Sequence, residues 1–460
     1  MKKKFKKLLA GLLSCAMIVC ASPMVPGKSV SAEALPGLAD LGRQVAAEGI
    51  VLLENPDVAD CGNSTGKVLP VDGGEMISVF GRSQLNYYKS GTGSGGAVQV
   101  EYTNSILDGL RSNPKVKVNE DLASVYKDWV ADHPFDNGGG GWAAEPWSQE
   151  EMPLDEGTVA DARAKSDVAI VIIGRTAGED KDNTYAKGAY LLTDKETDML
   201  DKVHAAFDRM VVVLNVGNVI DMSWVANYPK AAVLYAWQGG MKGGDAVADV
   251  ISGEVTPSGK LSDTIAKEIS DYPSDGSFEG KTQFGSSSAD YYAEDVYVGY
   301  RYFETFAEDR VLYPFGYGLS YACFAYSDLT VVANEQDKVT ISVTIRNKSD
   351  IDADEVVQVY CSSNIEEKCK NGKNTSYQSW LVPENQPCYS LCSFKRIHLK
   401  AGEVTNVLLE CQASAFESIL ENGERVALQG SYTLYVGGQQ PDARSTELTG
   451  EKCLQVAVER

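Results

Sequence analysis

Histidine is scarce in this sequence: the 460 residues include three, His133, His204 and His398, which lie far apart along the chain. The G-x-S-x-G motif of many serine hydrolases is absent as well, so the sequence does not support a Ser-His-Asp mechanism. The ten cysteines form no paired C-x-x-C units of the kind that bind zinc, and we expect no metal site. Basic residues are also few, with 42 Lys and Arg against 64 Asp and Glu. The net charge of −22 argues against nucleic acid as a partner, because phosphate contacts need clustered lysine and arginine.

Long apolar runs are missing after the first 34 residues. Lysines crowd residues 2–7, an apolar stretch of about 14 residues runs from Leu8 to Ala21, and Ala32-Glu33-Ala34 resembles a cleavage site. The stretch is too short to span a bilayer as a helix. We therefore expect residues 1–34 to be a signal peptide and the mature chain to be secreted, extracellular or periplasmic, without membrane contact after cleavage. A non-cleaved interfacial helix is the alternative, and the weak lipobox-like string Leu12–Cys15 leaves lipid anchoring as a minor one.

Most cysteines beyond the signal crowd into the C-terminal part of the chain. In an exported protein such cysteines commonly form disulfides. We expect one or more disulfides within residues 361–453, although the sequence does not determine the pairing. The cysteines concerned are Cys361, Cys369, Cys388, Cys392, Cys411 and Cys453.

Residues 35–264 alternate short apolar runs with amphipathic stretches, as expected for an α/β domain with a mostly parallel sheet sandwiched by helices. One helix is predicted from Asp194 to Arg209, because Thr193 and Glu196 form a capping box. A second runs from about Asp245 to Ser252. The candidate strands, all read as buried parallel strands, are Ile50–Leu53, Met76–Phe80, Val168–Ile173, Val211–Val216 and Ala232–Ala236.

After about Tyr321 the hydrophobic period changes from helical to alternating. This change predicts an all-β sandwich of fibronectin III or immunoglobulin type over residues 322–460. Residues 265–321, rich in Tyr, Asp and Ser, are interpreted as a connection that wraps between the two domains and closes the first. The strands predicted for the sandwich are Val339–Ile345, Val356–Tyr360, Val407–Leu409 and Ser431–Val436.

Ligands of open parallel sheets bind beyond the carboxyl ends of the strands, and this rule selects four loops. They begin at Gly81, Gly174, Gly217 and Trp237. The loop from Gly174 to Asn183 is the richest in charge. Its acids and bases are Arg175, Glu179, Asp180, Lys181 and Asp182.

A carboxyl group in that loop could act as a general acid if its pKa is raised. For Asp180 and Asp182 we favour a structural role, in which they cap a turn and pair with Arg175. For Glu179 the spacing alone does not separate the catalytic from the structural interpretation.

Two glycine-rich stretches also need interpretation. Residues 89–96 (KSGTGSGG) resemble a phosphate-binding loop, but no GKS or GKT ending follows the glycines, so neither nucleotide binding nor a cofactor is predicted. Residues 137–142 (NGGGGW), with Trp147 nearby, are typical of a mobile loop that presents indoles. Trp142 and Trp147 could stack on the apolar face of a sugar, or a tryptophan could instead cover an edge of the sheet.

Several long strings resemble glycoside hydrolase family 3, the β-glucosidase family, in the family's own order. One string, residues 166–183 (SDVAIVIIGRTAGEDKDN), resembles part of the family's second domain. Another, residues 313–321 (YPFGYGLSY), closes that domain in the family and precedes a fibronectin III-like domain. The match begins directly after the predicted signal, as in members with permuted domain order. Further matching strings are Trp237–Gly244, Thr256–Asp263 and Tyr292–Phe303.

The resemblance implies retaining hydrolysis of β-linked sugars, with Glu179 of the Gly178-Glu179 pair as acid/base and Arg175, Trp142 and Trp147 as substrate-binding candidates. In the family the nucleophile is an aspartate on a (β/α)8 barrel, and these 460 residues hold no such barrel. An oligosaccharide or β-glucoside substrate is expected, and activity would require a barrel from a separate polypeptide or a longer form of the gene. The rival hypothesis is a non-catalytic carbohydrate-binding or accessory protein that has lost the barrel. A split gene with an inert product is a third.

Overall fold

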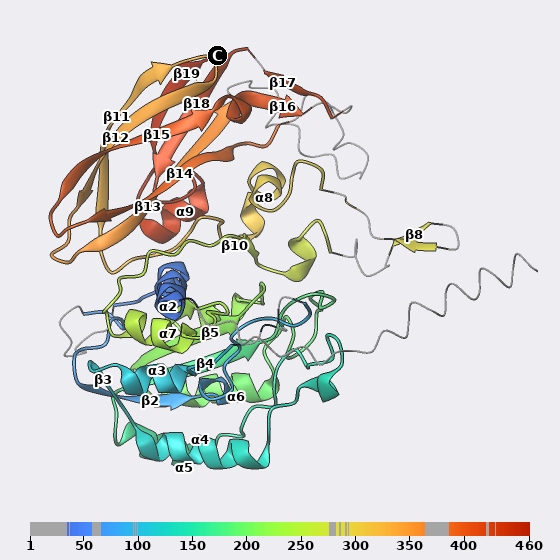
Figure 1. The fold of residues 1–460 in the computed structure, drawn as a ribbon, viewed down its shortest axis with the longest axis vertical. Helices are drawn as coiled ribbons and strands as arrows, with labels where there is room; N and C mark the ends of the chain where they lie inside the picture. Colours follow the sequence, from blue (N-terminus) through green and yellow to red (C-terminus); the bar gives the residue numbers. More distant parts are fainter. Residues whose placement is uncertain are drawn as a thin grey trace, which may run out of the picture. The chain divides into compact units, whose positions relative to one another are not determined.

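A six-stranded sheet with helices on both faces forms the first domain of the computed structural model (Figure 1). The strand order is β1-β6-β5-β4-β2-β3, and every pairing is parallel except that of β1 with β6. The strands are β1 (Val51–Glu54), β2 (Glu75–Phe80), β3 (Val116–Val118), β4 (Val168–Arg175), β5 (Arg209–Val216) and β6 (Ala231–Tyr235). The structure describes residues 35, 37–57, 66–94, 96, 98, 100–275, 282–284, 287–289, 292, 294–363, 386–419, 423–427 and 429–460. The predicted signal peptide lies outside these ranges.

Each face of the sheet has its own hydrophobic core. Along β4, Val168, Ile170 and Ile172 point to one core, and Ala169 and Val171 point to the other. This alternation explains why the strand is apolar throughout its length. One core includes α2 (Leu38–Gly49), α3 (Ile106–Ser112) and α7 (Gly243–Ile251); the other includes α4 (Glu120–Asp132), α5 (Glu156–Arg163) and α6 (Asp194–Ala206).

The capping box predicted for α6 is confirmed, since Thr193 Oγ1 accepts from the Glu196 N–H and Glu196 accepts from the Thr193 N–H. The helix ends at Ala206 rather than at Arg209, because Arg209 begins β5 and pairs with Glu75. The parallel direction predicted for the strand at residues 50–53 is wrong, because β1 runs antiparallel to β6 at the edge of the sheet. The short edge strand β3 was not predicted.

The second domain is a sandwich of two antiparallel sheets, with strand orders β11-β12-β15 and β14-β13-β18-β19. Apolar side chains from both sheets form one core. The predicted strands correspond to β12, β13, β15 and β18, whereas β11, β14, β19 and the helix α9 (Ala443–Thr449) were not predicted. The strands of the two sheets are β11 (Phe324–Asn334), β12 (Lys338–Asn347), β13 (Ala353–Ser363), β14 (Ser390–Leu399), β15 (Val404–Gln412), β18 (Ser431–Gly437) and β19 (Leu454–Glu459). Two further strands, β16 (Glu417–Ile419) and β17 (Arg425–Ala427), form a separate short sheet.

Between the domains, the chain forms several short elements, and Gly316 and Tyr317 near the end of this segment contact both domains. Tyr317 Oη donates to the Leu53 carbonyl at 2.9 Å, which ties this segment to β1. Gln358 of the sandwich donates to the Gly316 carbonyl at 2.9 Å. The elements are β7 (Ile265–Ala266), β8 (Thr282–Phe284), β9 (Ser287–Ala289), α8 (Tyr300–Phe306) and β10 (Val311–Tyr313).

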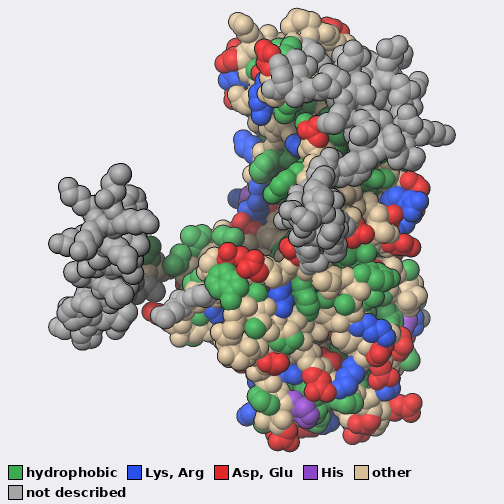
Figure 2. Space-filling view, turned by 90° about the vertical axis from the view of Figure 1, so that its right-hand side faces the viewer, with side chains coloured by type: hydrophobic (Ala, Val, Ile, Leu, Met, Phe, Trp, Pro, Cys, Tyr) green, Lys and Arg blue, Asp and Glu red, His purple; other side chains and the backbone are tan. Residues whose placement is uncertain are grey.

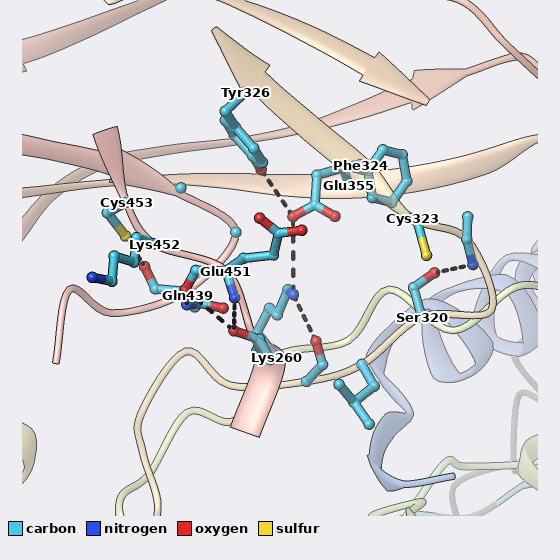
Figure 3. A pocket seen from close by; sticks show the side chains of 16 residues that line it. Lys260, Ser320, Cys323, Phe324, Tyr326, Glu355, Gln439, Glu451, Lys452 and Cys453 are labelled. Carbon is cyan, nitrogen blue, oxygen red and sulfur yellow. Dashed lines mark hydrogen bonds and ion pairs between the residues drawn. The ribbon is translucent and has the colours of Figure 1, made fainter. Parts of the chain in front are cut away.

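A cavity of about 240 Å³ lies where the two domains meet (Figure 3). Lys260 Nζ donates to the Gly318 carbonyl at 2.8 Å and lies 3.9 Å from Glu355 Oε1. Tyr326 Oη donates to the same Glu355 oxygen at 3.1 Å. Burial raises the pKa of the Glu355 carboxyl. The junction is therefore polar and hydrogen-bonded, which differs from a loose linker.

No helix in the described ranges is long and apolar enough to cross a membrane. On the face drawn in Figure 2, the lysine and arginine side chains are interspersed with acidic ones.

Glu304 of α8 is a buried acid at the same junction. Tyr389 Oη donates to its Oε2 at 2.6 Å, and Gln440 Nε2 donates to its Oε1 at 2.9 Å. Burial, with the nearby charge of Asp442, raises the pKa of Glu304 from its ordinary value of 4.5 to about 8. Between about pH 4.5 and pH 8, Glu304 is therefore protonated in the folded protein and ionised in the unfolded chain.

We predict that Glu304 makes stability decrease with rising pH. Its contribution is complete below pH 4.5 and is lost as the pH rises through about 8. In Glu304→Gln, an amide mimics the protonated carboxyl. The unfolding free energy of the wild type should fall, relative to this variant, by on the order of 2–4 kcal/mol across that window in urea denaturation. Asp309→Asn, an exposed control, should leave the pH dependence unchanged; parallel pH profiles for wild type and Glu304→Gln would contradict the prediction.

Candidate active site

The loop after β4 lies against the glycine-rich loop at residues 89–96. Thr92 forms a β-bridge with Gly178, and the Thr92 N–H donates to the Ala177 carbonyl at 2.5 Å. Two loops that are far apart in sequence are thus joined through their backbones. The described part of the glycine-rich stretch therefore supports the loop after β4.

This close approach requires glycine. A Cβ atom at Gly93 would lie 2.5 Å from the Glu179 Cβ, and one at Gly178 would lie 2.3 Å from the Thr92 carbonyl oxygen. Gly178 also has a φ of +140°, which side chains rarely adopt. The glycines therefore determine where Glu179 stands.

Glu179 is exposed at the carboxyl edge of the sheet. Its Oε2 accepts hydrogen bonds from the Ser94 hydroxyl at 2.7 Å and from the Ser94 N–H at 3.1 Å. These two bonds stabilise the ionised form and lower the pKa of the carboxyl, the hydroxyl contributing most. Among the described residues, no second carboxylate contributes to that shift. The Ser94 hydrogen bonds therefore favour the ionised carboxylate of Glu179 over its protonated form.

Arg175 is completely buried at the end of β4. Its guanidinium forms a bidentate ion pair with Glu196 of α6, at 2.6 and 2.8 Å. It also donates to the carbonyls of Ala189 and Leu191. The hypothesis that Arg175 pairs with the loop aspartates is wrong, since its partner is Glu196. We infer that Arg175 positions the loop; its burial leaves it no surface for the sugar contact that the sequence predicted.

Trp142 and Trp147, the two predicted sugar-binding tryptophans, both contact the loop that carries Glu179. Trp142 is 58% exposed, and its Nε1 donates to Asp180 Oδ2 at 2.7 Å. Asp180 has a φ of +56°, so it sits in a left-handed turn. Lys181 Nζ lies 5.1 Å from the centre of the half-buried Trp147 ring and donates to the Glu145 carbonyl. Asp180 therefore binds an indole, which is different from the turn-capping role predicted for it.

Two further loops of the predicted rim adjoin this site. Gln238 Nε2 donates to the Arg175 carbonyl at 3.3 Å. Asn215 of β5 accepts from the Tyr88 N–H at 2.8 Å and donates to the Trp237 carbonyl at 2.7 Å. Sequence reasoning missed Ser94 and Asn215. For Asn215 a signal existed, because it is a polar residue within an otherwise apolar strand.

The described ranges contain no group of three or more His, Cys, Asp or Glu side chains arranged to hold a metal ion.

Both domains match known families. Residues 50–321 match the model of the glycosyl hydrolase family 3 C-terminal domain, and residues 355–440 match that of the fibronectin type III-like domain. The chain therefore belongs to glycoside hydrolase family 3, as its motifs predicted.

Among curated relatives, a β-glucosidase of Ruminococcus albus is 45% identical over 411 residues, which cover 88% of this chain and 39% of the relative. An exo-alpha-(1->6)-L-arabinopyranosidase of Bifidobacterium breve is 29% identical, over 88% of this chain and 48% of the relative. The chain thus spans less than half the length of these two relatives.

Solved structures show the same partial coverage. A β-glucosidase from Paenibacillus barengoltzii aligns with a TM-score of 0.78 and 44% identity, over 92% of this chain and 43% of that one. β-Glucosidase 3B from Thermotoga neapolitana, solved in complex with glucose, aligns with a TM-score of 0.75 and 30% identity, over 92% of this chain and 54% of that one.

We predict that Ser94→Ala raises the pKa of the Glu179 carboxyl toward its ordinary value of 4.5. The variant removes the hydroxyl bond that favours the ionised form and leaves the backbone bond in place. The measurement is a ¹³C-carboxylate NMR titration, with Glu179→Gln used to assign the signal. Ser94→Thr, which keeps a hydroxyl, should retain the lowered value. A Ser94→Ala titration that coincides with the wild type would contradict the assignment.

We predict that Arg175→Met destabilises the protein by about 3–5 kcal/mol, because it leaves the Glu196 carboxylate buried without its partner. Chemical denaturation measures the loss. The control is Arg111→Met, which removes an exposed pair with Glu120 and should cost about 1 kcal/mol or less. Equal decreases in unfolding free energy in the two variants would contradict the prediction that the buried Arg175–Glu196 pair stabilises the protein more than the exposed pair does.

Proposed function

We propose that this chain supplies the acid/base carboxyl, Glu179, for retaining hydrolysis of β-linked sugars, with the nucleophile on a separate (β/α)8 barrel. The observation that supports this proposal most directly is the placement of Glu179. It stands at the carboxyl edge of a parallel sheet, exposed to solvent, on a loop fixed by the Thr92–Gly178 bridge and by Ser94.

A retaining glycosidase needs two carboxyl groups about 5–5.5 Å apart across the glycosidic bond. Among the described residues, no other carboxylate contributes to the pKa shift of Glu179. A nucleophile from outside this set of residues would complete the pair. Its negative charge, and the burial of Glu179 beneath a barrel, would raise the pKa of Glu179 and turn the carboxylate into a proton donor.

The relatives are named for different glycosides, so their names indicate a glycoside substrate without agreeing on the sugar. The R. albus and P. barengoltzii proteins are named as β-glucosidases, whereas the B. breve protein is named for an L-arabinopyranoside. We propose a terminal β-glucoside as the substrate. Trp142 would contact the sugar, because its exposed ring is held in place by Asp180.

A carbohydrate-binding accessory role is the second candidate, and the same Trp142 supports it. An exposed indole on a fixed loop offers a platform for a sugar ring whether or not a nucleophile is present. In either case we propose export through residues 1–34, which N-terminal sequencing of the secreted protein would test.

We predict that the isolated chain does not hydrolyse an aryl β-glucoside and that adding a separately produced family 3 barrel restores turnover. In the mixture, Glu179→Gln should lower kcat/KM for substrates with poor leaving groups by about 10²-fold or more. With an activated aryl β-glucoside, whose leaving group needs no protonation, azide should rescue the variant and yield a β-glycosyl azide, because the barrel's nucleophile still forms the glycosyl-enzyme. Asp182→Asn, on the same loop, is the matched control and should retain activity.

Two results separate the candidates. Turnover by the isolated chain that survives Glu179→Ala would reject the proposed mechanism. Glucose or cellobiose that quenches tryptophan fluorescence in the wild type but not in Trp142→Ala, with no turnover under any condition, would favour the accessory role.

A further inference from the structure

Three cysteines meet in the core of the fibronectin III-like domain. Cys361 lies on β13, Cys392 on β14 and Cys411 on β15. β13 and β14 belong to one sheet and β15 belongs to the other. Within these two sheets β14 and β15 are edge strands, so Cys392 and Cys411 face each other across one side of the sandwich.

A β-bulge brings Cys392 to this position. Val359 of β13 pairs with Ser393, but the next residue, Tyr360, pairs with Leu391, so Cys392 is the extra residue on β14. A bulge changes the direction of the side chain it carries. Cys392 Sγ lies 3.3 Å from the Val359 carbonyl oxygen and 3.1 Å from Cys411 Sγ.

The three sulfurs differ in their surroundings. Cys411 is completely buried, Cys361 is 6% exposed, and Cys392 is partly accessible. Burial raises the pKa of the Cys361 thiol to about 12. The contact with Cys411, together with burial, raises the pKa of Cys392. Both groups are therefore thiols at neutral pH, which makes their oxidation slow rather than forbidden.

We propose that Cys392 and Cys411 are a redox pair that oxidises to a disulfide between the two sheets. The pair is a dithiol in this structure. The sulfurs need to approach by about 1 Å to reach the bonding distance of a disulfide. Cys361 remains a thiol, because in the β13–β14 ladder it stands opposite Ser390 and not opposite Cys392.

The oxidant is an external disulfide, such as oxidised glutathione or the active-site disulfide of a thiol oxidase. The thiolate of the more accessible Cys392 attacks one sulfur of the oxidant, forms a mixed disulfide and releases a thiolate. The Cys411 thiolate then attacks Cys392 Sγ and displaces the second thiolate. The oxidant leaves as two thiols carrying both protons, and the protein gains one S–S bond.

This disulfide would link β15 to β14, the strand of the sandwich that contacts Tyr300 and Glu48 outside the sandwich. The Leu391 N–H donates to Tyr300 Oη at 2.8 Å, and Arg396 Nη2 lies 3.3 Å from Glu48 Oε1. Both Leu391 and Arg396 belong to β14. Linking β14 to β15 would limit the separation of the two edge strands and preserve these contacts between the domains.

The test is peptide mapping of the full chain after treatment with oxidised glutathione. Free thiols are blocked with N-ethylmaleimide in denaturant, and the protein is digested without reduction and analysed by mass spectrometry. The proposal expects a linked Cys392–Cys411 peptide and a blocked Cys361. It is overturned if Cys392 and Cys411 are both blocked, or if either is joined to a different cysteine.

Two variants make the mapping specific. Cys361→Ser should retain the link, and Cys411→Ser should leave Cys392 blocked by the maleimide. Reduction of the oxidised wild type should lower its melting temperature by roughly 5 °C more than reduction of Cys392→Ser does. An equal change in both proteins would contradict a bond that holds the sheets together. The mapping uses the wild type, so it decides the question even if a variant folds poorly.

Discussion

The backbone contact between residues 89–96 and the loop after β4 is the constraint on which the candidate site depends. The contact brings Thr92 against Ala177 and Gly178, and it is possible only because glycines remove the Cβ atoms that would collide there. It places Ser94 under the Glu179 carboxylate. Once that loop is fixed, Trp142 and Trp147 are fixed as well, through Asp180 and Lys181.

A second layer of support lies behind this loop. Arg175 ends β4 inside the protein and ties it to α6 through Glu196, so the strand and its loop share one rigid base. An exposed acid on such a base can meet a partner without reorganising. In this structure the hydrogen bonds from Ser94 lower the pKa of Glu179. Under the proposed function, a neighbouring negative charge and burial would instead raise that pKa.

The two domains are joined through polar contacts as well as apolar ones. Glu304 and Glu355 are buried where the sandwich meets the first domain, and each accepts a hydrogen bond from a tyrosine. Buried carboxyls of this kind make the joint sensitive to pH and specific in geometry. The same side of the sandwich carries β14, whose edge position and bulge bring Cys392 to Cys411. The junction therefore combines buried charge with hydrogen bonding.

The sequence by itself determined the two fold classes, the capping box of α6 and the position of Glu179 at the end of a strand. Such features depend on periodicity and on residues within one turn of each other, and these are visible in a linear string. Only the tertiary structure decided the direction of β1, the partner of Arg175, the role of the glycine-rich stretch and the meeting of Cys392 with Cys411. Each of these depends on segments from about twenty to more than a hundred residues apart, and their approach is set by packing and backbone hydrogen bonding. The position of Glu179 after a buried strand was therefore predictable from the sequence, whereas the groups that hold it in place were not.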